Sequence, residues 1–481
     1  MRRSERDRAS GAEAGFSARL GRLAPAGIRL LPLAGGDPSR LLRALPSAIA
    51  VQQRAGAPAP GPATPDAAAA IALPPGPPGR WRALVEEAAA TLPERGWLLV
   101  AGPGGDPAAA EAARDEMRLA VHEAGLVPVD GLPATAARPA LCLARRDPFR
   151  IRALAAGEEG LLAALFRRCF HTDRSAEEWE WRYRRHPHGG PWSSLAVDAT
   201  GAPVAHYGAY PVLLDRRERE RFRPLLAAQV GDLMCAPEAR AAGRGPTSLF
   251  ARTGDHFYAA RRCDGIAFSY GVHTGTSRAF SERFAGAVPF LPAPLRVLAT
   301  EEIDAAARRR ARALALGGWR ARRAAAPDRR FEGLYERARH GFTLLARRDR
   351  RYLGWRYFDR PGQSYELHLL ERGEELLGWG IFRREAERLI WGDALCDPSA
   401  AGGIALLLAS ALEATSTRPE RVEGWFSPEP AWWQRSLEEL GFRAAPDPQD
   451  LVFTCVGGRE PEPASALRTG FYLTRGDSDL F

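Results

Sequence analysis

The 481-residue sequence contains no lysine and no asparagine. All 67 of its basic residues are therefore arginines, and the formal net charge is +9. The loss of both residue types in a chain rich in Ala, Gly, Pro and Arg is typical of codon bias in a GC-rich genome. Because the arginines are spread along the chain among Asp and Glu, they do not form the basic patch that indicates nucleic-acid binding. We therefore expect no nucleic-acid partner.

Paired cysteines and long apolar runs are absent as well. The six cysteines stand alone, without a CxxC pair or a histidine at zinc-site spacing, so we expect free thiols and no metal. No apolar run reaches the roughly 18 residues that a membrane helix needs. The Arg-rich stretch 1–27 lacks the apolar core of a secretory signal and is expected to be a disordered leader. The sequence thus predicts a cytoplasmic protein without a membrane partner.

Strand and helix patterns alternate over residues 28–147. The Pro-, Ala- and Gly-rich stretch 56–78 interrupts them and is expected to be a linker. The apolar spacing predicts a helix over 81–92, a strand over 96–100, a long helix over 107–124 and a last strand over 140–144. This alternation favours an α/β domain of the Rossmann-like, doubly wound kind, with a largely parallel sheet.

Two segments of this first region, 92–100 and 125–129, resemble the second half of class I methyltransferases. In that family a Leu-Pro-x-x-Gly-Trp-like turn leads into a strand, a helix and a Gly-Leu-x-Pro segment. The family's glycine-rich cofactor loop is absent here, and Ala34-Gly35-Gly36-Asp37 is the nearest match. The resemblance implies a degenerate methyltransferase-like domain, and binding of S-adenosylmethionine is left open.

From residue 148 onward the sequence repeats itself. Trp181-Arg182-Tyr183 recurs as Trp355-Arg356-Tyr357, and the heptad from Gly231 to Pro237 recurs from Gly392 to Pro398. Two recurrences in the same order indicate a duplicated domain. We predict copy one over 148–299, a connecting helix over 300–326, copy two over 327–457 and a C-terminal tail over 458–481.

A loop with two glycines follows the predicted strand that ends at Cys235. The loop reads Arg240-Ala-Ala-Gly243-Arg244-Gly245, and a helical pattern begins directly after it. Glycines let the backbone approach a ligand, and the free amides of a first helical turn favour phosphate. This order predicts a pyrophosphate cradle, with a plain turn as the alternative. Copy two has Gly402 and Gly403 in this place but no arginine, so we expect a degenerate copy without a cradle.

With this loop, segment 230–245 resembles motif A of the GNAT superfamily of N-acetyltransferases, where the loop holds the pyrophosphate of acetyl-CoA. The segments 265–270 and 276–284, and Leu440-Gly441-Phe442 of copy two, resemble later elements of that family. The resemblance covers most of the chain after residue 148. It implies two tandem GNAT-type mixed-sheet domains and an acyl-CoA N-acyltransferase that moves an acetyl group from acetyl-CoA to a primary amine.

The resemblance also implies roles for residues of copy one. Asp232 would draw the proton from the amine, although Asp393 repeats it in copy two, which keeps a structural role open. The position of the family's usual acid holds Glu282 here, so the general acid is left open. Tyr270 is the nearby catalytic candidate, with pantetheine contact or cleft lining as its alternatives. A covalent acetyl-cysteine at Cys235 is disfavoured because Cys396 repeats that cysteine. The implied acetyl-CoA contacts are Leu233, Met234, Cys235, Arg240, Gly243, Arg244, Gly245 and His273.

The sequence does not specify the acceptor. A small-molecule amine or a sugar-linked substrate fits the predicted chemistry, and a homodimer is left open. Two other functions stay open beside acetyl transfer. One is a Fem-like transferase that uses aminoacyl-tRNA, against which the Arg240–Gly245 loop argues. The other is a non-catalytic acyl-CoA sensor or scaffold, which the degenerate second copy favours.

Overall fold

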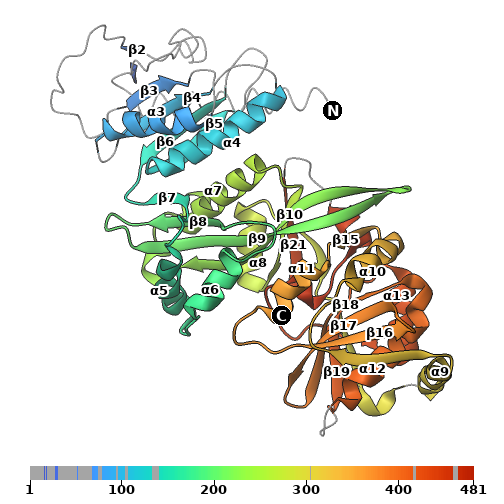
Figure 1. The fold of residues 1–481 in the computed structure, drawn as a ribbon. Coiled ribbons are helices and arrows are strands. Elements are labelled where there is room, and N and C mark those ends of the chain that lie inside the picture. Colours follow the sequence, from blue (N-terminus) through green and yellow to red (C-terminus); the bar gives the residue numbers. More distant parts are fainter. Residues whose placement is uncertain are drawn as a thin grey trace. The chain divides into compact units, whose positions relative to one another are not determined.

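The structure is a computed structural model of the chain (Figure 1). It describes residues 16, 18, 28–30, 51–52, 68–73, 78–93, 96–102, 107–132, 140–303, 305–414, 419–458 and 464–481. The chain divides into two compact units. Unit one comprises residues 1–172, 193–208 and 233–264, and unit two comprises residues 173–192, 209–232 and 265–481. Nearly all of the expected leader, much of the expected linker and the Ala34–Asp37 turn lie outside the described residues. The described part of the range 56–78 contains a strand, Ala68–Ala72, in which residues 69–71 are buried, so the prediction of a linker is wrong there.

A six-stranded mixed sheet forms the N-terminal part of unit one, in the order β2-β1-β3-β4-β6-β5. The parallel strands are β1 (Ile28–Leu30), β2 (Val51–Gln52), β3 (Ala68–Ala72) and β4 (Trp97–Ala101). Strand β6 (Leu141–Arg146) runs antiparallel between β4 and β5 (Leu126–Leu132). The predicted strands at 96–100 and 140–144 are confirmed, whereas β5 was not predicted as a strand.

Helices α3 (Pro78–Ala90) and α4 (Pro107–Glu123) pack against each other and against this sheet (Figure 1). Both were predicted from their spacing. In α3, Trp81, Leu84, Val85 and Ala88 recur at helical spacing and are buried, so a single apolar stripe holds the helix.

The remainder of unit one carries the predicted cradle. Its elements include β7 (Arg150–Ala153), which pairs with β8 (Trp192–Val197), and the helices α5 (Glu159–Phe170) and α7 (Leu249–Cys263). Helix α7 packs against α4 of the N-terminal part. Arg262 of α7 binds both carboxylate oxygens of the buried Asp115 of α4, at 2.7 and 2.8 Å. A buried carboxylate held by a bidentate arginine fixes orientation as well as contact.

Two long strands, β9 (Pro203–Glu218) and β10 (Arg221–Cys235), run through both units. In unit two they join a sheet whose order is β12-β21-β11-β10-β9-β15-β22. The other members are β11 (Phe268–His273), β12 (Val288–Pro292), β15 (Leu344–Ala346), β21 (Val452–Gly457) and β22 (Phe471–Tyr472). Helices on this part of the chain are α6 (Ala176–Tyr183), α8 (Gly275–Phe284) and α14 (Ala464–Gly470).

A second sheet of unit two belongs to copy two and has the order β14-β16-β17-β18-β19-β13-β20. Its strands are β13 (Leu295–Ala299), β14 (Trp319–Ala324), β16 (Glu366–Arg372), β17 (Glu375–Glu385), β18 (Arg388–Cys396), β19 (Arg421–Trp425) and β20 (Arg443–Ala444). The helices are α9 (Ala305–Leu316), α10 (Arg330–Ala338), α11 (Arg350–Leu353), α12 (Ile404–Glu413) and α13 (Ala431–Leu440), with a π-helical turn at Gly354–Phe358.

The expected connecting helix over 300–326 is only partly helical. Helix α9 ends at Leu316, and Gly318 follows with a φ of 81°, a left-handed conformation that ends a helix and that glycine adopts without strain. The chain then continues as strand β14, which pairs with β16. The second half of the predicted helix is therefore wrong, because the glycine pair at 317–318 turns the chain into a sheet.

The two copies exchange their last strands. Strand β21 is the last strand of copy two in the chain but pairs with β11 of copy one. Strand β13 is the last strand of copy one but pairs with β19 of copy two. Two equivalent tryptophans meet in the same reciprocal way: Trp181 Nε1 donates to the Trp355 carbonyl at 2.7 Å, and Trp355 Nε1 donates to the Trp181 carbonyl at 2.9 Å. The sequence repeat is thus matched by reciprocal contacts within unit two.

Candidate functional site

The predicted cradle lies in unit one between the end of β10 and the start of α7. The chain passes through a 3₁₀ turn at Pro237–Ala239, an open loop and a second 3₁₀ turn at Gly245–Thr247. Gly243 and Gly245 have φ values of 81° and 56°. A Cβ atom on Gly243 would collide with the main-chain oxygen of Thr247. This position therefore requires glycine on two grounds, conformation and space.

The loop, rather than the helix, presents the unbonded amides. At the start of α7, Ser248 Oγ accepts from the Ala251 amide at 3.3 Å, and the Ala242 carbonyl accepts from the Leu249 amide at 2.8 Å. The expected free amides of the first helical turn are thus partly used by the serine cap, which corrects the sequence prediction. The amides of Gly243, Arg244 and Gly245 donate no hydrogen bond to any described residue.

Two exposed arginines give this loop its charge. Arg240 Nε donates to the Cys235 carbonyl at 3.2 Å, which anchors the start of the loop to the end of β10. No carboxylate among the described residues pairs with the guanidinium of Arg240 or Arg244, and the neighbouring Glu238 is bound by Arg168. Unbonded amides and uncompensated cations together make an anion site.

In unit two, the strands β10 and β11 separate before they end. Their parallel pairing covers only Ala227–Gln229 with Phe268–Tyr270, although both strands continue. Asp232 has a φ of 53°, which is a strained value for a residue other than glycine. The main chain of β10 past Gln229 is therefore not tied to β11 by a ladder. Leu233, Met234 and Cys235, whose amides the resemblance assigns to the thioester, lie on this continuation of β10.

Asp232 is the centre of a buried ion-pair network. Its Oδ2 accepts from Arg174 Nη1 at 2.8 Å, from Arg182 Nη1 at 2.7 Å and from the Tyr183 hydroxyl at 2.8 Å. Burial lowers the pKa of Arg182, but attraction to Asp232 outweighs it and holds that pKa well above its usual value. Three donors on one oxygen hold the carboxylate in place, an arrangement that favours a structural role over that of a base.

The equivalent aspartate of copy two has the same kind of partners. Asp393 accepts from Arg348 Nε at 2.9 Å and from the Tyr357 hydroxyl at 2.7 Å. Tyr357 and Tyr183 are equivalent in the repeat, so the Tyr–Asp bond is common to both copies. The sequence marked both aspartates and both tyrosines, but it did not show that they bond to one another.

Three further predicted site residues are largely removed from water. Tyr270 is 2% exposed, its ring lies 5.4 Å from that of Phe471, and burial raises its pKa well above the usual value. Burial lowers the pKa of His273 to about 4, so its imidazole is neutral at pH 7. Burial also raises the pKa of Cys235 to about 11, which leaves its thiol protonated at neutral pH and poorly suited to act as a nucleophile.

The C-terminal tail contributes a carboxyl group, that of Asp479, to which the sequence analysis assigned no role. A Cβ atom on Gly231 would lie 2.6 Å from Asp479 Oδ2, so the Asp479 carboxyl rests against β10 one residue before Asp232. Burial raises the pKa of Asp479, while the attraction of Arg182 opposes the rise. The acidic run Asp477-Ser-Asp479 at the end of the chain is the only local signal for this placement.

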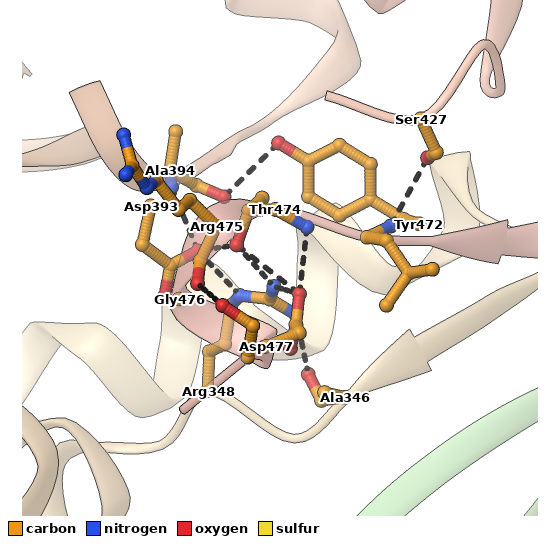
Figure 2. A network of polar contacts seen from close by, with 12 residues as sticks. Ala346, Arg348, Asp393, Ala394, Ser427, Tyr472, Thr474, Arg475, Gly476 and Asp477 are labelled. Atoms are coloured by element: carbon orange, nitrogen blue, oxygen red, sulfur yellow. Dashed lines mark hydrogen bonds and ion pairs between the residues drawn. The ribbon is translucent and has the colours of Figure 1, made fainter. Parts of the chain in front are cut away.

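In copy two the same tail fills the space where the strands separate (Figure 2). The pairing of β18 with β19 ends at Trp391 and Gly424. Beyond it, Thr474 forms a bridge with Phe426, and its Oγ1 bonds to Asp393 Oδ1 at 3.0 Å. The Tyr472 hydroxyl donates to the Ala394 carbonyl at 3.3 Å. The tail therefore occupies the gap between the separated strands of copy two.

Two more contacts close copy two. A Cβ atom on Gly392 would collide with the Phe481 ring, which packs directly on β18. The loop that corresponds to the cradle is a 3₁₀ helix, Pro398–Gly403, that leads straight into α12. In it, Gly403 is buried against Leu370 and Trp319. This loop is packed, whereas the loop of copy one is open.

The described residues offer no group of three or more His, Cys, Asp or Glu side chains that could hold a metal ion. Among the described helices, none is long and apolar enough to cross a membrane.

Comparison with known proteins gives only structural likenesses. No family model and no curated protein matches the chain. Similar solved structures include an Enterococcus faecalis V583 protein described as a probable N-acyltransferase (TM-score 0.48, 13% identity, covering 65% of this chain and 73% of that one). They also include a GCN5-related N-acetyltransferase from Kribbella flavida (TM-score 0.45, 17% identity, 64% and 70%). A third is the Saccharomyces cerevisiae N-myristoyltransferase with bound myristoyl-CoA (TM-score 0.39, 11% identity, 68% and 85%).

These three structures are thus described as a probable N-acyltransferase, a GCN5-related N-acetyltransferase and an N-myristoyltransferase. At TM-scores below 0.5 and identities below 20%, these likenesses carry no part of the proposal that follows.

Proposed function

We propose that this chain is an acyl-CoA N-acyltransferase that holds the pyrophosphate of acetyl-CoA on the loop Arg240–Gly245. The observation that carries the proposal is the state of this loop. Three consecutive amides, from Gly243 to Gly245, donate to no described residue, and the two arginines beside them, Arg240 and Arg244, pair with no carboxylate in the described part of the chain. A pyrophosphate would satisfy both the amides and the charges.

The chemistry that follows is acetyl transfer to a primary amine. The amine must lose a proton, the thioester carbonyl must be polarised, and the leaving thiolate must gain a proton. We propose that a main-chain amide of β10, past the end of its pairing with β11, polarises the carbonyl. The acceptor is a small molecule or a sugar-linked amine.

For the proton acceptor we favour Asp479 over Asp232. Three donors already bond to Asp232 Oδ2, and a base must be able to take up a proton. The Asp479 carboxyl rests against the same strand, and its raised pKa brings it closer to the working range of a general base. Burial raises the pKa of Tyr270, so its hydroxyl is a weak acid and a poor proton donor to the thiolate.

Thermal denaturation with acetyl-CoA, CoA and S-adenosylmethionine tests the proposal. A ligand at 100 times its Kd stabilises the native state by about 2.7 kcal/mol. We expect acetyl-CoA and CoA to raise the melting temperature of the wild type, and the double variant Arg240→Glu, Arg244→Glu to lose that shift. Arg443→Glu, a charge reversal at an exposed arginine of copy two, is the matched control and should keep it. An unchanged shift in the double variant would remove the loop as the site.

A non-catalytic acyl-CoA sensor is the second candidate. The buried Tyr270 and the fully engaged Asp232 favour it, because neither is free to move a proton. Acetyl-CoA binding without release of free CoA, across a panel of small and sugar-linked amines, would select the sensor. Release of CoA that depends on an added amine would select the transferase.

A further inference from the structure

A cavity in unit one lies directly beside the cradle loop. Its volume is about 360 Å³, within the range of roughly 300–1,000 Å³ that is typical of small-molecule sites. The N-terminal sheet supplies one wall, with Trp97 from β4 and Val127 from β5. The loop supplies another, with Gly243 and Thr247. The cavity therefore joins the N-terminal part of the chain to the proposed pyrophosphate site.

Aromatic side chains give this cavity flat apolar surfaces. Trp97 and Phe149 both line it and are half-buried, while Val127 is buried beneath. Stacking of a base on an aromatic side chain stabilises the complex and does not depend on the identity of the base. The wall contributed by the N-terminal part thus suits a planar heterocycle.

The charges around the cavity favour a phosphate. Its acidic residue, Asp147, is already paired with Arg252, and both side chains are 5% exposed. Arg145 also lines the cavity, is exposed, and pairs with no carboxylate among the described residues. The unbonded amide of Gly243 lies on the same cavity wall. One uncompensated cation and nearby free amides leave the cavity with positive potential.

We infer that the N-terminal part of the chain binds the nucleotide end of the acyl-CoA. The sequence of this part did not predict that role. The purine lies on the rings of Trp97 and Phe149, a phosphate of the ribose pairs with Arg145, and the pyrophosphate lies on the loop. This inference rests on the proposed function and extends it to a second region of unit one. The bidentate Asp115–Arg262 pair joins α4 to α7 and so fixes the two walls of the cavity relative to each other.

Isothermal titration of the full-length chain with three ligands tests the inference. The ligands are acetyl-CoA, acetyl-CoA without its 3′-phosphate, and adenosine 3′,5′-bisphosphate. For the wild type we expect loss of the 3′-phosphate to weaken binding about tenfold, as for one charge-assisted hydrogen bond. Arg145→Ala should bind both forms of acetyl-CoA equally. Trp97→Leu should weaken both about tenfold, and Phe149→Leu serves if Trp97→Leu does not fold.

Arg150→Ala is the matched control, because Arg150 is equally exposed and bonds to Glu86 instead of lining the cavity. It should bind as the wild type does. If Arg145→Ala, Trp97→Leu and Phe149→Leu all bind acetyl-CoA as the wild type does, the inference is overturned and the proposed function stands. If the wild type binds the bisphosphate but not acetyl-CoA, both are overturned, and the cavity is a site for a free nucleotide.

Discussion

The two copies of the repeat differ in what lies beside two equivalent strands, β10 of copy one and β18 of copy two. In copy one the loop Arg240–Gly245 is open and the amides of Gly243, Arg244 and Gly245 donate to no described residue, while in copy two the corresponding Pro398–Gly403 segment is wound into a helical turn. The tail completes the contrast, because Thr474 and Phe481 pack on β18 of copy two. What both copies keep is the buried aspartate with its tyrosine and arginine partners. The shared features therefore belong to the fold, and the differing features belong to ligand binding.

The largest expected effect comes from the shared aspartate. Asp232→Ala leaves Arg182, which is 4% exposed, without its main counter-charge. Removing one partner of a buried ion pair costs about 3–5 kcal/mol. We expect a free energy of unfolding lower by that amount in urea denaturation, and a similar loss for Asp393→Ala. A stable Asp232→Ala protein that binds acetyl-CoA but does not turn over would contradict the structural role.

The open loop should be far more sensitive than its counterpart in copy two. Gly243→Asp places a side chain and a negative charge where a Cβ atom already collides with Thr247. We expect a loss of acetyl-CoA affinity of at least about 100-fold, equal to about 2.7 kcal/mol. Gly402→Asp is the control, because nothing lies within 4 Å of a Cβ atom there. Equal losses of acetyl-CoA affinity in the two variants would contradict the proposed difference between the copies.

The C-terminal tail should pack more tightly on copy two than on copy one. A Cβ atom on Gly392 meets the Phe481 ring, whereas one on Gly231 meets the end of the Asp479 side chain. Overpacking of a buried site costs about 1–3 kcal/mol. Gly392→Ala should therefore lower the melting temperature more than Gly231→Ala does. A larger loss for Gly231→Ala would show that the tail packs mainly on copy one.

The smallest effect is expected at Cys235. With a pKa of about 11, its thiol is protonated at pH 8, and the thiolate fraction rises tenfold with each pH unit up to that value. Alkylation of Cys235 by iodoacetamide should be very slow at pH 8 and should accelerate steeply toward pH 11. The unfolded chain, whose cysteines have an ordinary pKa near 8.5, is the control. Fast alkylation of the folded chain at pH 8, or loss of turnover in Cys235→Ser, would restore the covalent alternative.

Local patterns in the sequence were enough to predict several elements and the loop. The stripe of Trp81, Leu84 and Val85 predicted α3, and the compact apolar run before Gly102 predicted β4. The positions of Gly243 and Gly245 predicted a loop that only glycine can form. Each of these features depends on neighbours within a few residues, so the sequence expresses them directly.

The remaining features depend on residues that are far apart in the chain. Asp232 is bound by Arg174, Arg182 and Tyr183, which precede it by about fifty residues. No local sequence pattern predicts partners at that separation. The exchange of β13 and β21 between the copies is also a long-range pairing. In the N-terminal sheet, expected to be largely parallel, β6 pairs antiparallel with both β4 and β5, and β5 was not predicted as a strand. Long-range pairing thus decided both the form of the sheets and the surroundings of the site.

The central claim, one working acyl-CoA site in copy one and a filled copy two, is tested most directly by the stoichiometry of acetyl-CoA binding. Isothermal titration of the full-length wild type should give one acetyl-CoA per chain. A stoichiometry of two would show that copy two also binds the ligand despite its tail. No binding at all would contradict the open loop as an acyl-CoA site.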